Sequence, residues 1–165
     1  MKLFIAICSA TLLSFSISAL AQSNQSYSKQ YSKNPSAQVK AEKVFIFDPR
    51  TKKWAAYQNG KKVGSGPANG GKPGYHTPRG TFHIYSKKGP NHVSSKYPVY
   101  SNGSRGGAKM PYAMHFTKAG HAIHGSPTIS NQNSSHGCIR VKTSAAKWLN
   151  ESFMTRNTKV IVYPY

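Results

Sequence analysis

The sequence predicts a mainly β, sandwich-like domain with one short helix near its end. Short apolar segments recur between residues 44 and 165, and clusters of Gly, Pro, Asn and Ser separate them. Many short strands with turn signals between them are typical of packed sheets. A segment of helix-forming composition occurs once, at residues 143–153.

The first 21 residues have the pattern of a secretory signal peptide. Lys2 precedes an apolar run, and Ala19 and Ala21 supply the small residues of a cleavage site before Gln22. The alternative, a membrane anchor, fits poorly because the run barely reaches spanning length and is broken by serine and threonine. We therefore expect export to the periplasm or cell wall, with no membrane span after cleavage.

The remaining chain divides into a tail and a domain. Residues 22–41 are rich in Ser, Gln, Asn and Lys and show no apolar period. Such a segment buries too little apolar surface to offset its ordering entropy, so we expect a disordered basic and polar tail. Residues 42–165 suit one folded domain with one hydrophobic core.

Strands account for most of this domain. Asn59-Gly60 is a two-residue hairpin signal, and a Gly/Pro-rich loop is expected at 64–80. In residues 81–85, Phe82 and Ile84 share one face. The expected strands are 44–47, 53–57, 61–63, 81–85, 97–100, 112–116, 121–125 and 159–165. In the helix, Thr143 or Ser144 is the expected N-cap, and the two large apolar residues, Trp148 and Leu149, should face the core.

The charge balance narrows the choice of partners. The chain has 23 Lys and Arg residues against 3 Asp and Glu, a formal net charge of +20, and loss of Lys2 with the signal peptide leaves +19. A positive electrostatic field of this strength favours an anionic partner, which could be nucleic acid, an anionic membrane surface or an anionic cell-wall polymer. Three carboxylates are too few for paired-carboxylate glycoside hydrolysis or an oxygen cage for calcium.

Cys138 is the single cysteine after the signal peptide, so the mature chain forms no internal disulfide. An unpaired thiol in an exported protein suggests intermolecular pairing or a reactive group. A thiol becomes nucleophilic when a neighbouring imidazole takes its proton. His136 lies two residues earlier, on the same face of an extended segment, and a turn-rich connection could return His124 to the cysteine.

The residues around the cysteine suit acyl chemistry. Gly137 permits a sharp turn, after which the N–H groups of residues 136–138 could face a developing oxyanion. Arg140 could hold a substrate carboxylate.

Two other interpretations stay open: Cys138 could be an inert buried residue, or a zinc ligand. The zinc set would be His121, His124, His136 and Cys138. Against zinc, His121 and His124 are three residues apart and would face opposite sides of a strand.

Four motifs resemble the L,D-transpeptidase catalytic domain, also called the YkuD domain. "HGSP" at 124–127 and "SHGCIRV" at 135–141 resemble the signature of this family. "TPRGTFHI" at 77–84 and "MPYAMHF" at 110–116 resemble its upstream elements, and the likeness runs from about Lys43 to the end. Two departures stand out: only ten residues separate His124 from Ser135, and Arg140 replaces an asparagine of some members.

The resemblance implies a cysteine acyltransferase of the bacterial cell wall that needs no metal or other cofactor. Cys138 would attack the carbonyl before the terminal D-alanine of a tetrapeptide stem, release D-alanine and form a thioester. An amine of a second stem would then resolve the thioester into a 3→3 cross-link. Acylation of the cysteine by carbapenems is also implied.

The same resemblance assigns roles to individual residues. His124 would be the general acid and base, oriented by the carbonyl of Gly125, and the backbone of residues 135–138, Ser135 and Gly137 included, would form the oxyanion hole. His136 would be functionally important. Tyr112 and His115 would line the substrate cleft, together with Arg140.

Alternative functions are a cationic exported protein that binds cell wall or nucleic acid on an inactive scaffold, and a secreted thiol protease. We favour the transpeptidase, acting as a monomer on peptidoglycan stem peptides with no dedicated nucleic-acid partner; anionic cell-surface polymers are a second candidate partner. The acyl acceptor stays open between another stem, a lipoprotein lysine and a free D-amino acid.

Overall fold

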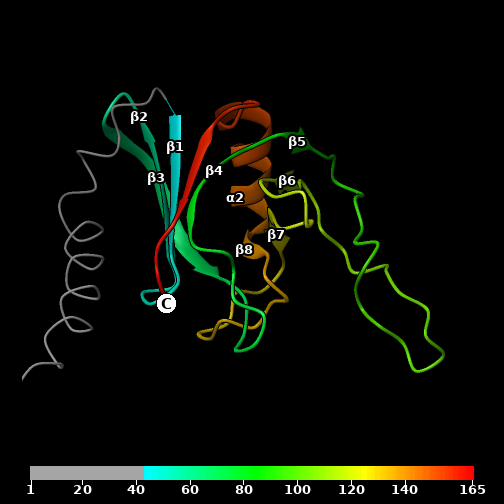
Figure 1. Ribbon diagram of the computed structural model, residues 1–165. Coiled ribbons are helices and arrows are strands. Elements are labelled where there is room, and N and C mark those ends of the chain that lie inside the picture. Colours follow the sequence, from blue (N-terminus) through cyan, green and yellow to red (C-terminus); the bar gives the residue numbers. More distant parts are fainter. Residues whose placement is uncertain (1–42) are drawn as a thin grey trace, which may run out of the picture. The chain divides into compact units, whose positions relative to one another are not determined.

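The computed structural model describes residues 43–165 (Figure 1). The expected signal peptide at 1–21 and the expected tail at 22–41 lie outside the described residues. None of the helices within the described range has the length and hydrophobicity needed to cross a bilayer.

The described chain is mainly β, with one short helix directly after the cysteine motif, as the sequence predicts. The strands are β1 (Lys43–Asp48), β2 (Lys53–Gln58), β3 (Lys61–Asn69), β4 (Gly80–His83), β5 (Ser86–Lys87), β6 (Met114–His115), β7 (Ala122–Ser126), β8 (Ile139–Lys142) and β9 (Lys159–Val162). The helix α2 (Thr143–Trp148) continues into a π-helical turn, η2 (Leu149–Phe153).

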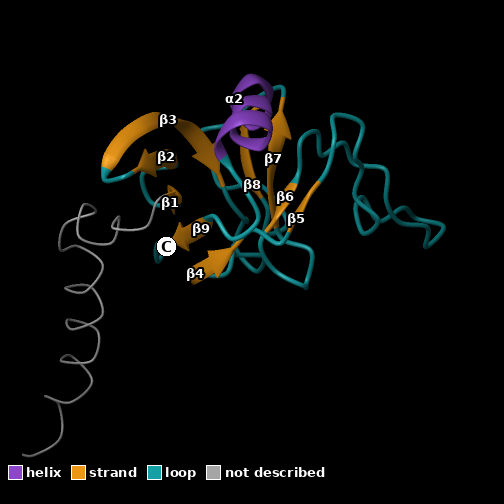
Figure 2. Cartoon of the chain, turned by 90° about the horizontal axis from the view of Figure 1, so that it is seen from above, coloured by secondary structure: helices purple, strands orange, loops and turns teal. Residues whose placement is uncertain are grey.

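The nine strands form one curled sheet in the order β4-β9-β1-β2-β3-β8-β7-β6-β5. Strand β3 joins the two halves: its first part pairs with β2, and Ala68 and Asn69 at its end pair with β8. Figure 2 shows β3 arching from one half to the other. The sandwich-like arrangement therefore comes from a single sheet that bends at one long strand.

The hydrophobic core lies between the two halves and under the helix. Helix α2 packs against β7 and β8. Side chains from both halves and from the helix meet in one cluster, which includes Phe45, Phe47, Met114, Ile123, Ile139, Leu149 and Val160. The cluster ties β7 and β8 to the rest of the sheet through contacts on their inner face.

The hairpin expected at Asn59-Gly60 is confirmed, with both residues at positive φ (49° and 79°) as a type I′ turn requires. Strand β3, however, runs six residues into the loop expected at 64–80. Its glycines are strand residues that make room for tryptophans. A Cβ at Gly64 would lie 3.0 Å from Trp148, and one at Gly66 would lie 3.0 Å from Trp54.

Two other local predictions are wrong. The helix has neither Thr143 nor Ser144 as its N-cap, because the chain passes from extended Lys142 straight into helical geometry without a side-chain cap. Residues 97–100 form no strand. They contain a cis Tyr97–Pro98 bond and belong to the long excursion between β5 and β6, which projects from the body in Figure 1.

A short loop after β3 holds the cysteine motif in place. The N–H of Ser135 donates to the Gly70 carbonyl (3.0 Å), and the N–H of Lys72 donates to the Ser135 carbonyl (2.9 Å). Gly71 between them has no space for a side chain, because a Cβ there would lie 1.7 Å from the Tyr75 carbonyl oxygen. Its N–H donates to the buried Thr77 hydroxyl (3.1 Å), which gives the "TPRG" motif a structural role.

We expect Gly71→Ala to destabilise the domain by about 3 kcal/mol, because backbone must move to admit the methyl group. Urea unfolding measures the effect. Gly89→Ala is the matched control, since a Cβ at Gly89 meets nothing within 4 Å, and it should change stability by less than about 0.5 kcal/mol. Equal stability of the two variants would contradict this account of the loop.

Candidate active site

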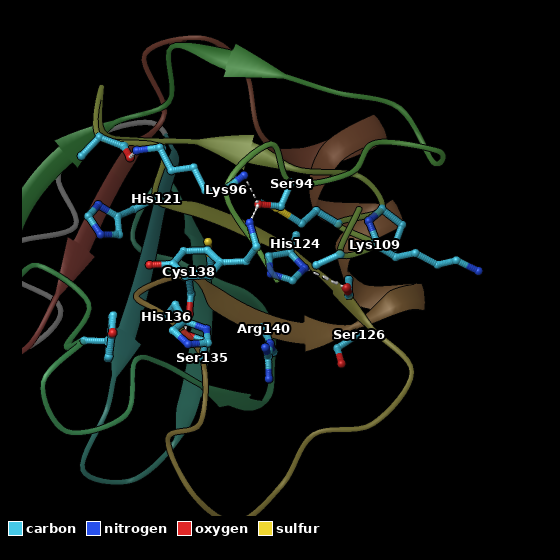
Figure 3. Close-up of a pocket in the computed structure, with 18 of the residues that line it drawn as sticks. Ser94, Lys96, Lys109, His121, His124, Ser126, Ser135, His136, Cys138 and Arg140 are labelled. Atoms are coloured by element: carbon cyan, nitrogen blue, oxygen red, sulfur yellow. Dashed lines mark hydrogen bonds between the residues drawn. The ribbon is translucent and has the colours of Figure 1, made fainter. Parts of the chain in front are cut away.

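A cavity of about 800 Å³ contains most of the residues that the sequence singled out (Figure 3). Its lining includes Cys138, His124, Gly125, Ser135, His136 and Arg140. Gly137, in the turn before the cysteine, is buried and is not part of the lining.

The pairing of β7 with β8 brings the cysteine to its histidine. The two strands are parallel, with Ile123 opposite Ile139 and His124 opposite Arg140. Cys138 comes immediately before β8 and therefore lies beside the start of β7. Residues fourteen apart in the chain become neighbours by sheet register rather than by local turns.

The His124 imidazole is buried, and its tautomer follows from its hydrogen bond. Nδ1 lies 2.9 Å from the Gly125 carbonyl oxygen. A carbonyl can only accept, so Nδ1 carries the proton and Nε2 has a free lone pair. Burial lowers the pKa of His124 to about 4; the Gly125 bond opposes this shift, and the charge of Arg140 adds to it. The ring is therefore a neutral base at neutral pH.

The Cys138 thiol is also neutral at rest. Burial raises its pKa, while a hydrogen bond from the Ala122 backbone and the charge of Arg140 act in the opposite direction. The thiol consequently needs a base to remove its proton. His124 Nε2 is chemically suited to that task.

The turn before the cysteine is tied by one hydroxyl. Ser135 Oγ accepts the N–H of Gly137 (3.1 Å) and donates to the Cys138 carbonyl (2.6 Å). Gly137 has φ +105°, a conformation that glycine adopts without strain. The Gly137 N–H is thus already bonded and does not face the cavity as a free donor, contrary to the sequence-based expectation for residues 136–138.

His136 lies between two tyrosines that the sequence did not indicate. Its ring stacks on Tyr97 (centroids 4.2 Å apart, planes 15° apart) and meets the edge of Tyr75 (4.8 Å, 81°). Partial burial lowers the pKa of His136, and the charges of Lys72 and Arg140 lower it further. These contacts hold a neutral ring at the cavity wall.

The cavity has a positive lining. Lys96, Lys109 and Arg140 line it, and no Asp or Glu does. Of the two carboxylates in the described range, Asp48 lies 3.4 Å from Arg50 outside the cavity. The site therefore favours an anionic ligand.

A family model matches residues 42–162, and it describes the L,D-transpeptidase catalytic domain, YkuD. The chain belongs to this family. It is 33% identical over 97 residues to L,D-transpeptidase 1 of Mycobacterium tuberculosis, an alignment that covers 55% of this chain and 39% of the relative.

Solved structures agree with the family assignment. An L,D-transpeptidase from Mycobacterium smegmatis superposes with a TM-score of 0.65 at 26% identity, over 75% of this chain and 59% of that one. One from Xylanimonas cellulosilytica superposes with a TM-score of 0.62 at 28% identity, over 74% and 61%. The chain thus spans less than two thirds of the length of these L,D-transpeptidases.

Two residues expected in the substrate cleft lie outside the cavity lining of this L,D-transpeptidase domain. Neither Tyr112 nor His115 lines the cavity. Tyr112, at positive φ (57°), packs against the core, and His115 meets the edge of His92 with centroids 5.5 Å apart. The Tyr112 ring therefore packs on the core, whereas His115 is close enough to the site for its charge to contribute to the lowered pKa of His124.

His121 was expected to face away from His124, yet both line the cavity. Strand β7 begins at Ala122, so the alternation of a strand does not extend to His121. The zinc alternative receives no support from the geometry: across residues 43–165, no three His, Cys, Asp or Glu side chains converge as a metal would require.

The depressed pKa of His124 predicts a pH-dependent stability. The unfolded chain takes up a proton at this residue below about pH 6.5, whereas the folded protein does so only near pH 4. The stability contributed by the neutral ring is therefore complete above pH 6.5 and lost as the pH falls to 4, a loss of about 3 kcal/mol.

Urea unfolding of the wild type and His124→Gln between about pH 7 and pH 4 measures this contribution. The wild type should lose about 3 kcal/mol more than the variant over that range. If the free energy of unfolding fell equally with pH in the wild type and in His124→Gln, His124 would not be the group responsible for the pH dependence.

Proposed function

We propose that the protein is an exported peptidoglycan L,D-transpeptidase that uses Cys138 as nucleophile. The observation that supports this most directly is that Cys138 and buried His124, whose Nε2 has a free lone pair, line the same positively charged cavity. The family to which the chain belongs supports peptidoglycan stem peptides as the acyl donor.

The first half-reaction makes a thioester. The Cys138 proton passes to His124 Nε2, and sulfur attacks the carbonyl carbon between the third stem residue and the terminal D-alanine. The carbonyl electron pair moves onto oxygen, which the backbone N–H groups of His136 and Cys138 would stabilise. Return of that pair breaks the C–N bond, and the D-alanine amine takes the proton from His124.

The second half-reaction restores the enzyme. An acceptor amine attacks the thioester carbon and gives its proton to His124, and the sulfur leaves and takes that proton back. One amide bond replaces another, so the balance requires no cofactor and no external energy source.

The remaining site residues would hold the substrate. Arg140, Lys96 and Lys109 supply positive charge for the carboxylates of stem peptides. Gly125 fixes the His124 tautomer, Ser135 ties the nucleophile turn, and His136 with its tyrosines forms one wall.

A carbapenem should acylate Cys138. Mycobacterium tuberculosis L,D-transpeptidase 1 has been solved in complex with imipenem, and that structure superposes with a TM-score of 0.65 at 26% identity, over 74% of this chain and 59% of that one. The shared fold, with a thiol and a neutral imidazole in one cavity, supports binding of a carbapenem and acylation of Cys138 here.

We expect the mature protein to release D-alanine from a disaccharide tetrapeptide and to form a stem dimer. Mass spectrometry of the products measures both. Cys138→Ala should abolish them, and His124→Gln should slow acylation by about a hundredfold or more through loss of the base. Identical product profiles from the wild type and Cys138→Ala would refute the proposal.

Export and targeting belong to the same proposal. Residues 1–21 would direct secretion, and residues 22–41 with the basic domain surface would hold the monomer on anionic cell-surface polymers.

Mature protein bound to purified wall should elute as sodium chloride rises from about 0.05 M to about 1 M, because screening removes long-range attraction. Retention at high salt, measured by sedimentation with the wall, would contradict electrostatic targeting.

A further inference from the structure

We propose that His121 donates a hydrogen bond, through its Nε2–H, to the oxygen of the carbonyl that Cys138 attacks. This assignment rests on the proposed acyl transfer and adds to it a substrate-contacting residue. Three observations support it: the tautomer of His121, its position against Gly137, and the use of the Gly137 N–H elsewhere.

The tautomer follows from the two hydrogen bonds of Thr117. The backbone N–H of His121 donates to Thr117 Oγ1 (3.2 Å), and His121 Nδ1 lies 2.8 Å from the same oxygen. The Thr117 hydroxyl has one proton of its own to donate, and we assign that hydrogen bond to the Nδ1 lone pair. The ring proton is then on Nε2. Burial lowers the pKa of His121, and the charge of Lys96 adds to the shift, so the ring is neutral at neutral pH.

The position follows from the contact with the nucleophile turn. A Cβ built at Gly137 would lie 2.6 Å from His121 Cδ2 and 2.8 Å from Nε2. The edge of the ring that bears Nε2 therefore rests on the residue directly before Cys138. In the view of Figure 3, Cys138 lies between the imidazoles of His121 and His124. Both imidazoles and the thiol line the same cavity.

The site needs this donor because one of its backbone donors is occupied. The Gly137 N–H points to Ser135 Oγ (3.1 Å), which in turn donates to the Cys138 carbonyl. A developing oxyanion in this turn therefore lacks one N–H group. His121 Nε2–H lies against the same glycine and can replace it.

The two histidines are complementary because their Nδ1 partners differ. The Gly125 carbonyl places the His124 proton on Nδ1 and leaves Nε2 to accept. In the assignment made above, the Thr117 hydroxyl donates to His121 Nδ1, so the His121 proton is on Nε2 and Nε2 is a donor. His121 transfers no proton in this scheme; it stabilises charge on oxygen.

The test compares two reactions of the same sulfur in the mature protein. Acylation by imipenem places negative charge on a carbonyl oxygen, whereas alkylation by iodoacetamide forms an S–C bond as iodide leaves and creates no oxyanion. In both reactions, His124 must remove the proton from the Cys138 thiol. A donor to the oxyanion therefore affects the first rate and spares the second.

His121→Phe keeps an aromatic ring on Gly137 and removes the donor. We expect imipenem acylation to slow by about a hundredfold, the effect of losing one oxyanion donor, while alkylation stays within about twofold. His121→Gln, which restores a side-chain N–H, should recover part of the acylation rate. Exposed His83 on β4 supplies the matched control, and His83→Phe should change neither rate.

Thr117→Val provides an independent variant should His121→Phe not fold. It leaves the imidazole in place but removes the hydroxyl that bonds to Nδ1, so the ring proton is no longer held on Nε2. Acylation should slow by about tenfold, and alkylation should not slow. Unchanged acylation in both variants would overturn the assignment, and so would equal loss of both rates, which would indicate packing alone. Absence of any imipenem adduct or D-alanine release in the wild type would instead refute the proposed function.

Discussion

The parallel register of β7 against β8 is the constraint on which the site depends. Parallel neighbours cannot be joined by a tight hairpin, and they need a connection of about a dozen residues or more. The chain from Ser126 to Ile139 meets that minimum, and its far end is fastened to the loop after β3 through Ser135. This explains how a short span between His124 and Ser135 still closes the site. Core packing of Ile123 and Ile139 then keeps the register from slipping.

A second consequence concerns protons. The same enclosed environment lowers the pKa of His124 and raises that of Cys138, so the resting pair is thiol and imidazole rather than thiolate and imidazolium. If Cys138 is the nucleophile, as proposed, charge separates only when a substrate carbonyl can receive the developing charge. In the proposed reaction, the hydrogen-bond donors of the cavity matter most at that moment, because a site that excludes water strengthens their interaction with the oxyanion.

Local chemistry made much of this molecule predictable. The Asn59-Gly60 hairpin, the short strands and the helix after the cysteine follow from turn preferences and apolar patterns, and the motifs indicated Cys138 and His124. Predictions failed where distant residues decide the outcome. Gly64 is predicted as a loop residue, but it lies in β3 and makes room for the Trp148 indole of α2. Tyr97 reaches His136 only because the excursion between β5 and β6 folds back, and no local pattern encodes that return. His121 does not follow the alternation of side chains between the two faces of a strand, because β7 starts one residue after it.

The protonated state of Cys138 also bears on its chemical durability. Peroxides and disulfides react with the thiolate, and a thiol whose pKa is raised is correspondingly slow to enter the ladder that begins with sulfenic acid. In the proposed reaction, burial beside a neutral histidine would let the sulfur react when a bound electrophile and its base act together. The same burial would keep the sulfur unreactive toward an oxidant that arrives alone.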